Sequence, residues 1–133
     1  MSRINQLYTG DHRCLAEHHI SHDQILTDAP TDHAGLSRSF APTDLLATAV
    51  GNATLTAMGI KAEEMGVNMF GTRAETNKVM STEGPRRVEL ITVNVEFPFT
   101  VSESDRTILK EIGLTNPVYL SVKDSINVIF TFN

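Results

Sequence analysis

Residues 42–60 read PTDLLATAVGNATLTAMGI, and their apolar positions repeat with the period of an α-helix. The repeating positions are Leu45, Leu46, Ala49, Val50, Ala53, Ala57 and Ile60. Pro42 and Asp44 suit a first helical turn, where a missing N–H is harmless and a carboxylate meets the positive end of the helix dipole. Gly66 is well placed to end the helix. The pattern therefore predicts a long helix between Pro42 and Gly66.

Two glycines, Gly51 and Gly59, lie inside the predicted helix. Each costs about 1 kcal/mol relative to alanine at an interior helix position. Alanines surround both glycines, so one side of the helix is unusually thin. We expect this thin side to allow close approach by another helix, which makes this the central, buried helix of the fold.

Strands are predicted on both sides of the helix. Residues 1–40 alternate short apolar segments with turn-forming residues, which is typical of a strand meander. After the helix, the alternation from Ile91 to Phe99 indicates a strand with one buried face. Gly84-Pro85 favours a turn between this strand and a segment from Val67 to Ser81, which predicts a long hairpin.

The last third of the chain predicts two shorter helices and a strand. Ser102 or Ser104 can cap a helix that Gly113 ends. Asn116-Pro117 opens a short helix through Lys123, and alternation from Ile126 onward predicts a strand reaching the last residue. The predicted fold class is α+β: a strand meander, a long helix, a hairpin, two helices and a strand.

Length and composition favour one domain over residues 1–133. The net charge of −5 leaves no basic surplus for a phosphate backbone, so nucleic acid is not an expected partner. The N-terminus has no apolar run of signal-peptide length, and no stretch approaches the length of a membrane span. We expect a cytoplasmic protein without a cofactor. Cys14 is the only cysteine, which excludes an intrachain disulfide.

A cluster of histidines raises the question of a metal site. His12, His18, His19 and His22 are close in sequence, but adjacent strand residues face opposite ways. No second cysteine or dense carboxylate cluster completes a tetrahedral ligand set, so we expect no metal. Serine-nucleophile and phosphate-loop motifs are also missing from the sequence.

Cys14 has two interpretations. The guanidinium of the preceding residue, Arg13, could favour the thiolate and make Cys14 reactive. Against this, adjacent strand residues face opposite ways, and a lone cysteine is most often a small core residue.

The sequence resembles the OsmC/Ohr family over nearly its whole length. The match is carried by Thr27-Asp28-Ala29-Pro30, then Gly35, then the segment from Phe40 to Asn52 that enters the long helix. Residues 114–118 (LTNPV) are similar to the segment where the family usually has Cys-Pro-Val. The resemblance implies an OsmC-like fold and an intertwined homodimer that reduces organic hydroperoxides in the oxidative-stress response. It also implies two cysteines, one attacking the peroxide and one resolving the product as a disulfide.

Both family cysteine positions depart from that pattern. Ala53 stands where the first cysteine is expected on the helix, and Asn116 stands before Pro117 where the second is expected. Neither side chain can replace a thiolate, because alanine has no nucleophile and an amide does not attack an O–O bond. The thiol peroxidase mechanism is therefore expected to be absent, leaving a degenerate active site.

The resemblance also implies an arginine near the first strand turn, held by a carboxylate near the helix start. Arg13 and Asp44 are the nearest matches, although Asp44 is offset by one residue from the position that some members use. With Asn52, Ala53 and Asn116 they form the expected pocket, either vestigial or binding a small apolar or anionic ligand. The alternative is that Arg13 is a strand-edge cation and Asp44 a helix-start anion.

Two other functions stay open. Cys14 could be a relocated nucleophile that needs an external thiol, or the partner subunit's Cys14, to resolve it. The chain could instead bind another protein through exposed strand edges. The thin helix face and the apolar last strand also favour a homodimer, since both are difficult to bury in one chain of this length.

Overall fold

The computed structural model describes all residues from 1 to 133. The chain forms two compact parts, residues 1–46 and residues 47–133. The elements of the two parts follow the order strand meander, long helix, hairpin, two helices and strand. This order confirms the predicted α+β fold.

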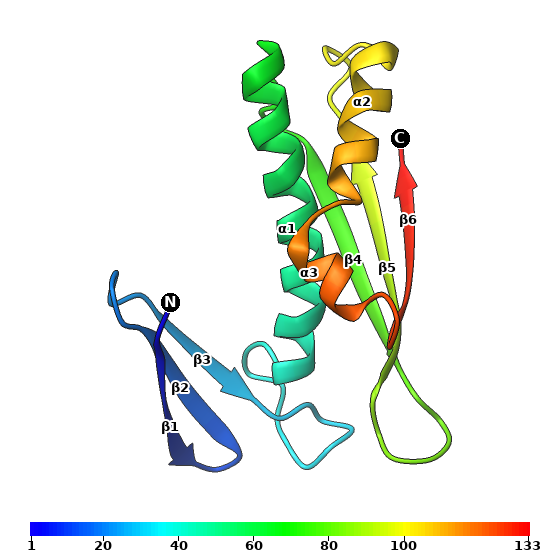
Figure 1. Cartoon of the computed structure of the whole chain (residues 1–133). Helices are drawn as coiled ribbons and strands as arrows, with labels where there is room; N and C mark the ends of the chain where they lie inside the picture. The colour runs from blue at the N-terminus through cyan, green and yellow to red at the C-terminus, as the bar shows by residue number, and fades with distance from the viewer. The chain divides into compact units, whose positions relative to one another are not determined.

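The N-terminal part is an antiparallel sheet followed by a loop (Figure 1). Its strands are β1 (Ile4–Gly10), β2 (Arg13–His18) and β3 (Gln24–Asp28), in the order β1-β2-β3. This is the predicted meander. In the loop after β3, a Cβ on Gly35 would lie 1.6 Å from the carbonyl oxygen of Ala29, so only glycine fits there.

The long helix α1 (Pro42–Met65) has the predicted bounds. The Asp44 carboxylate accepts a hydrogen bond from the Ala41 N–H at 2.8 Å, satisfying a donor at the helix start. Gly66, with φ +69°, follows the last helical residue, where a left-handed conformation favours glycine.

The C-terminal part is a three-stranded sheet with helices on one face (Figure 1). Its strands are β4 (Arg73–Met80), β5 (Val88–Glu96) and β6 (Asn127–Phe132), in the order β4-β5-β6. Strands β4 and β5 form the predicted antiparallel hairpin, and β6 pairs with β5 in parallel. The shorter helices are α2 (Glu103–Gly113) and α3 (Pro117–Val122). Ser102, one of the two predicted caps, caps α2 and accepts from the Asp105 N–H.

The core of this part lies between α1, α2 and the sheet. Three alternate residues of β5, Ile91, Val93 and Val95, are fully buried there. They pack with Val50 and Met58 of α1 and Leu109 of α2. The prediction that the strand reaches Phe99 is wrong, because β5 ends at Glu96 and Phe99 is 93% exposed. The two residues after Phe97, a proline and an exposed phenylalanine, lie outside the ladder because proline cannot donate to it.

The interior glycines of α1 have different surroundings from those expected. A Cβ on Gly51 would lie 2.5 Å from the Thr76 Oγ1 on β4, so the close neighbour of this glycine is a strand rather than a helix. A Cβ on Gly59 would meet no atom within 4 Å. The expected close approach of a helix is therefore wrong at Gly51, where a strand side chain occupies the space.

None of the helices combines the length and the apolar character needed to traverse a lipid bilayer.

Candidate functional site

Asn116, at the second family cysteine position, is held by three side-chain hydrogen bonds. Its side chain is the N-cap of α3, and its Oδ1 accepts from the Tyr119 N–H at 2.8 Å. Its Nδ2 donates to the Gly113 carbonyl at 2.9 Å and to the Thr54 Oγ1 at 3.2 Å. The residue is 2% exposed. All of its hydrogen-bonding groups therefore serve the fold.

The side chain of α1 that Asn116 contacts belongs to Thr54, the residue after Ala53. Thr54 is fully buried, and its hydroxyl donates to the Val50 carbonyl one turn earlier at 2.9 Å. Ala53 itself is half-buried. A buried threonine hydroxyl that donates to a carbonyl has no base to activate it, so this pair lacks a nucleophile.

A small cleft lies beside Asn52, next to the first family cysteine position. It has a volume of about 220 Å³ and is lined by α1 and β4 residues, including Thr48, Gly51, Asn52 and Thr76. Gly51, where the missing Cβ leaves room for Thr76, is therefore also part of the wall of this cleft. The lining is mainly polar, which favours a ligand that exchanges hydrogen bonds with hydroxyl and amide groups.

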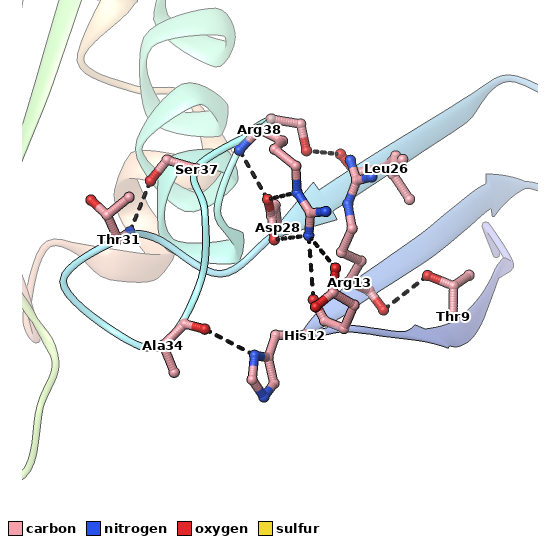
Figure 2. Close-up of polar contacts among 11 residues, drawn as sticks. Thr9, His12, Arg13, Leu26, Asp28, Thr31, Ala34, Ser37 and Arg38 are labelled. Carbon is pink, nitrogen blue, oxygen red and sulfur yellow. Dashed lines mark hydrogen bonds and ion pairs between the residues drawn. The ribbon is translucent and has the colours of Figure 1, made fainter.

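Arg38 and Asp28 form an ion pair in the N-terminal part (Figure 2). The Arg38 Nε donates to the Asp28 Oδ2 at 2.7 Å, and the Arg38 backbone N–H donates to the same oxygen at 2.9 Å. The side chain of Asp28 is fully buried, whereas that of Arg38 is 36% exposed and also reaches Asp11 at 2.9 Å. The pair ties the loop before α1 to the end of β3.

These hydrogen bonds shift both ionisation equilibria. Side-chain and backbone hydrogen bonds from Arg38 lower the pKa of Asp28 from 3.8 to about 2, against the opposing effect of burial. Hydrogen bonds to Asp28 and Asp11 raise the pKa of Arg38 above its ordinary value. Asp28 is therefore a carboxylate at any physiological pH.

Arg13 lies directly opposite Asp28 in the pairing of β2 with β3. Its charge adds to the lowering of the Asp28 pKa, after the larger contributions from Arg38. The Arg13 Nε is buried and has no hydrogen-bond partner. The structure thus brings Arg13 to Asp28, and the predicted pairing of Arg13 with Asp44 stays a prediction.

Sequence reasoning missed Arg38 and Asp28 as site residues. Asp28 was visible as part of the Thr27-Asp28-Ala29-Pro30 motif, but nothing in the sequence marks its carboxylate as buried. A charged residue ending a strand and followed by a rigid proline turn could have suggested a buried partner. Arg38 lies 10 residues later in a loop, a separation that no local pattern predicts.

The Asp28 carboxylate makes acid stability testable. Ionised Asp28 stabilises the fold above its ordinary pKa of 3.8, and this stabilisation is lost as the pH falls toward about 2. We expect Asp28→Asn to unfold more readily than wild type at neutral pH, with a smaller further loss between pH 3.8 and about 2. Thermal unfolding against pH measures this. Asp124→Asn, at a side chain that is 88% exposed, should keep the wild-type pH dependence, and identical profiles for Asp28→Asn and wild type would contradict the assignment.

Cys14 is exposed on β2, contrary to its interpretation as a small core residue. It pairs with Tyr8 and Thr27 on the flanking strands. Arg13 is the preceding strand residue, so the two side chains project from opposite faces of the sheet.

The histidines of the N-terminal part make separate contacts. His12 Nδ1 lies 2.9 Å from the Ala34 carbonyl, and His18 Nδ1 lies 2.8 Å from the Ser21 Oγ. His19 contacts Arg3, and His22 contacts Glu17. No three metal-ligating side chains come together in the structure.

Neither a family model nor a curated protein matches the sequence. Among solved structures, the chain is similar to a candidate osmotic stress induced and detoxification response protein from Psychrobacter arcticus 273-4. The two are 37% identical with a TM-score of 0.89, over 99% of this chain and 94% of the other.

Two solved structures of lower identity share the fold. The organic hydroperoxide resistance protein OsmC of Legionella pneumophila is 9% identical, with a TM-score of 0.79 over 100% of this chain and 96% of the other. The organic hydroperoxide resistance protein OhrB of Bacillus subtilis is 11% identical, with a TM-score of 0.74 over 100% and 98%. With the 37% identity over nearly its full length, the chain belongs to the OsmC/Ohr family.

Proposed function

We propose that this chain is a catalytically silent OsmC/Ohr protein: a cytoplasmic homodimer of single-domain subunits that binds a small ligand and has no thiol peroxidase activity. The observation that carries the proposal is that both Nδ2 and Oδ1 of Asn116, at the second cysteine position, are hydrogen-bonded within the fold. A residue that caps a helix and joins it to α1 has a structural role of its own. Position 116 therefore has a structural role in place of a catalytic one.

The chemistry of peroxide reduction supports this conclusion. A thiolate must attack one peroxide oxygen, and a second thiol must then resolve the resulting sulfenic acid as a disulfide. The C-terminal part, which carries both family positions, contains no cysteine. At those positions Ala53 has no polar group and Asn116 is hydrogen-bonded to the neighbouring Thr54, and neither Asn116 nor Thr54 can carry out the attack.

A ligand-binding role is supported by the polar cleft beside Asn52. Its volume of about 220 Å³ is below that of pockets for drug-sized ligands and suits only a very small molecule, with which its hydroxyl and amide groups can exchange hydrogen bonds. Of the positions that the family resemblance implies, Arg13, Asp44, Asn52 and Ala53 remain candidate ligand contacts, whereas the amide of the buried Asn116 is bonded within the fold. Of these residues, Asn52 is exposed and lines the cleft.

The homodimer is supported by apolar side chains that the single chain leaves exposed. In the N-terminal sheet, Leu7 and Tyr8 are each 63% exposed and Ile25 is 47% exposed. Large apolar side chains exposed on both faces of a sheet indicate an interaction surface, and a second subunit is the simplest cover for it.

Light scattering tests the dimer directly. We expect a mass of twice the 14.6 kDa of one chain across the micromolar range. A clean monomer at these concentrations would exclude the intertwined arrangement.

Hydroperoxide consumption tests the silent site. We expect cumene hydroperoxide to decay no faster with the protein and dithiothreitol than with dithiothreitol alone. A matched assay with a cysteine-dependent peroxidase shows that the conditions support turnover. Wild-type consumption at the rate of a dedicated enzyme would overturn the proposal.

The exposure of Cys14 favours one alternative, a thiol-dependent hydroperoxide reductase. The Cys14 thiolate would attack a peroxide oxygen, the O–O bond would break, and an alcohol would leave as Cys14 becomes a sulfenic acid. Two equivalents of an external thiol would return it to the thiol, releasing water and a disulfide. This alternative requires consumption that Cys14→Ala abolishes, whereas consumption that survives Cys14→Ala contradicts both candidate functions.

A further inference from the structure

A second cleft lies in the C-terminal part, between α2 and the ends of β5 and β6. Its volume is about 320 Å³, and its walls include Phe97, Arg106, Lys110 and Phe132. Figure 1 shows α2 beside the C-terminal end of β6. None of these residues lines the cleft beside Asn52, so the two sites are separate.

Stacked aromatic rings form the floor of this cleft. The Phe97 and Phe132 ring centroids are 6.5 Å apart with an angle of 21° between the planes. Phe130 continues the stack at 6.1 Å from Phe132. Phe97 is 9% exposed and belongs to the core, so the floor is held in place by the packing of the whole sheet.

One face of α2 supplies the charged wall. Arg106 and Lys110 are four residues apart and so project from the same side of the helix. The Arg106 Cζ lies 5.7 Å from the Phe97 ring centroid, and the Lys110 Nζ lies 5.5 Å from that of Phe132. Each cation therefore lies above one ring of the stack.

The two cations differ in whether their N–H groups already donate hydrogen bonds within the protein. Arg106 donates to the carbonyls of Val101 and Pro98, at 2.9 and 3.1 Å, and so holds the turn between β5 and α2. Lys110 is exposed, its ammonium lies over the Phe132 ring, and no hydrogen bond or ion pair joins it to another side chain. Its N–H groups are free to donate to an anion.

The charge balance limits which anion fits. Glu103 also lines the cleft, so its three charged side chains, Glu103, Arg106 and Lys110, sum to one positive charge. The chain as a whole carries −5, which repels highly charged anions at long range. A single negative charge close to Lys110 satisfies both conditions. An apolar ring attached to that charge can contact Phe132, which is partly exposed at the cleft.

We propose that this cleft binds a small aromatic monocarboxylate. The carboxylate accepts hydrogen bonds from the Lys110 ammonium, and the ring of the ligand packs against the edge of Phe132. The volume of about 320 Å³ is at the lower end of ligand pockets, which suits a single-ring acid.

Titration of the full chain with benzoate, followed by NMR, tests the site. We expect saturable shifts at Lys110, Phe132 and Asn133, with benzamide binding at least tenfold more weakly because it lacks the charge. Lys110→Gln should weaken benzoate about tenfold, the loss expected for one charge-assisted hydrogen bond. Lys123→Gln removes the same charge at an exposed lysine outside the cleft and should leave the affinity unchanged.

Three results would overturn the proposal. Benzoate shifts that fail to saturate would show that the cleft has no site. Equal weakening by Lys110→Gln and Lys123→Gln would show an effect of overall charge alone. Sulfate binding as tightly as benzoate would show an anion site without aromatic recognition. An unchanged benzoate affinity in Phe132→Leu would support the same conclusion.

Discussion

Replacing Asn116 by alanine is expected to lower the free energy of unfolding by about 2–4 kcal/mol. The substitution removes the N-cap of α3, which contributes about 1 kcal/mol. It also leaves the Gly113 carbonyl without its side-chain donor in a region that is closed to water. A buried acceptor without a partner costs about 1–3 kcal/mol. Chemical denaturation of wild type and variant measures the difference.

Two variants show which of these bonds matters. Asn116→Ser keeps an acceptor at the N-cap and loses the amide donors, so an intermediate loss is expected. Asn68→Ala removes a side chain that also accepts from a backbone N–H, that of Phe70, but in an exposed loop. Water can replace that bond, so the change should stay within about 0.5 kcal/mol. Equal effects of Asn116→Ala and Asn68→Ala would show that Asn116 has no special structural role.

Replacing Gly51 by alanine is expected to destabilise the chain by about 1–2 kcal/mol, although alanine is the better helix former. The new Cβ would lie 2.5 Å from the Thr76 Oγ1, so the threonine side chain or the strand must move. That strain outweighs the gain in helix propensity of about 1 kcal/mol. The measurement is again the free energy of unfolding.

A second substitution at Thr76 tests the cause. In a Thr76→Ala background the clashing oxygen is gone, and the Thr76 Cβ at 3.7 Å makes only an ordinary contact. Gly51→Ala should then become neutral or stabilising, giving a coupling energy of about 1–3 kcal/mol between the two positions. Gly51→Ala with the same cost in both backgrounds would place the strain elsewhere.

The helices and strands were predictable because their signals are local. The repeat after Pro42, the capping serine at Ser102 and the proline after Asn116 act within a few residues of one another. The wrong strand end at Phe99 follows from a pattern that continued past a residue unable to join the ladder, and the first hairpin strand begins at Arg73 rather than at Val67. The family resemblance was also local, since it rested on continuous motifs around the start of α1.

The candidate site was predictable only in part. The sequence placed Asn116 at a cysteine position but could not show that Thr54, rather than Ala53, supplies its partner on α1. That partner depends on how α1 is rotated about its axis against α2 and α3. Arg38 was missed for a similar reason, because its contact with Asp28 joins a loop to a strand end.

By itself, the sequence determined the order of the elements, the ends of α1, the family and the absence of a second thiol. Only the tertiary structure decided that Asp28 is buried, that Cys14 is exposed and that Gly51 makes room for Thr76. Periodicity and capping are properties of neighbouring residues along the chain. Burial and contact depend on segments distant in sequence that come together only when the chain packs.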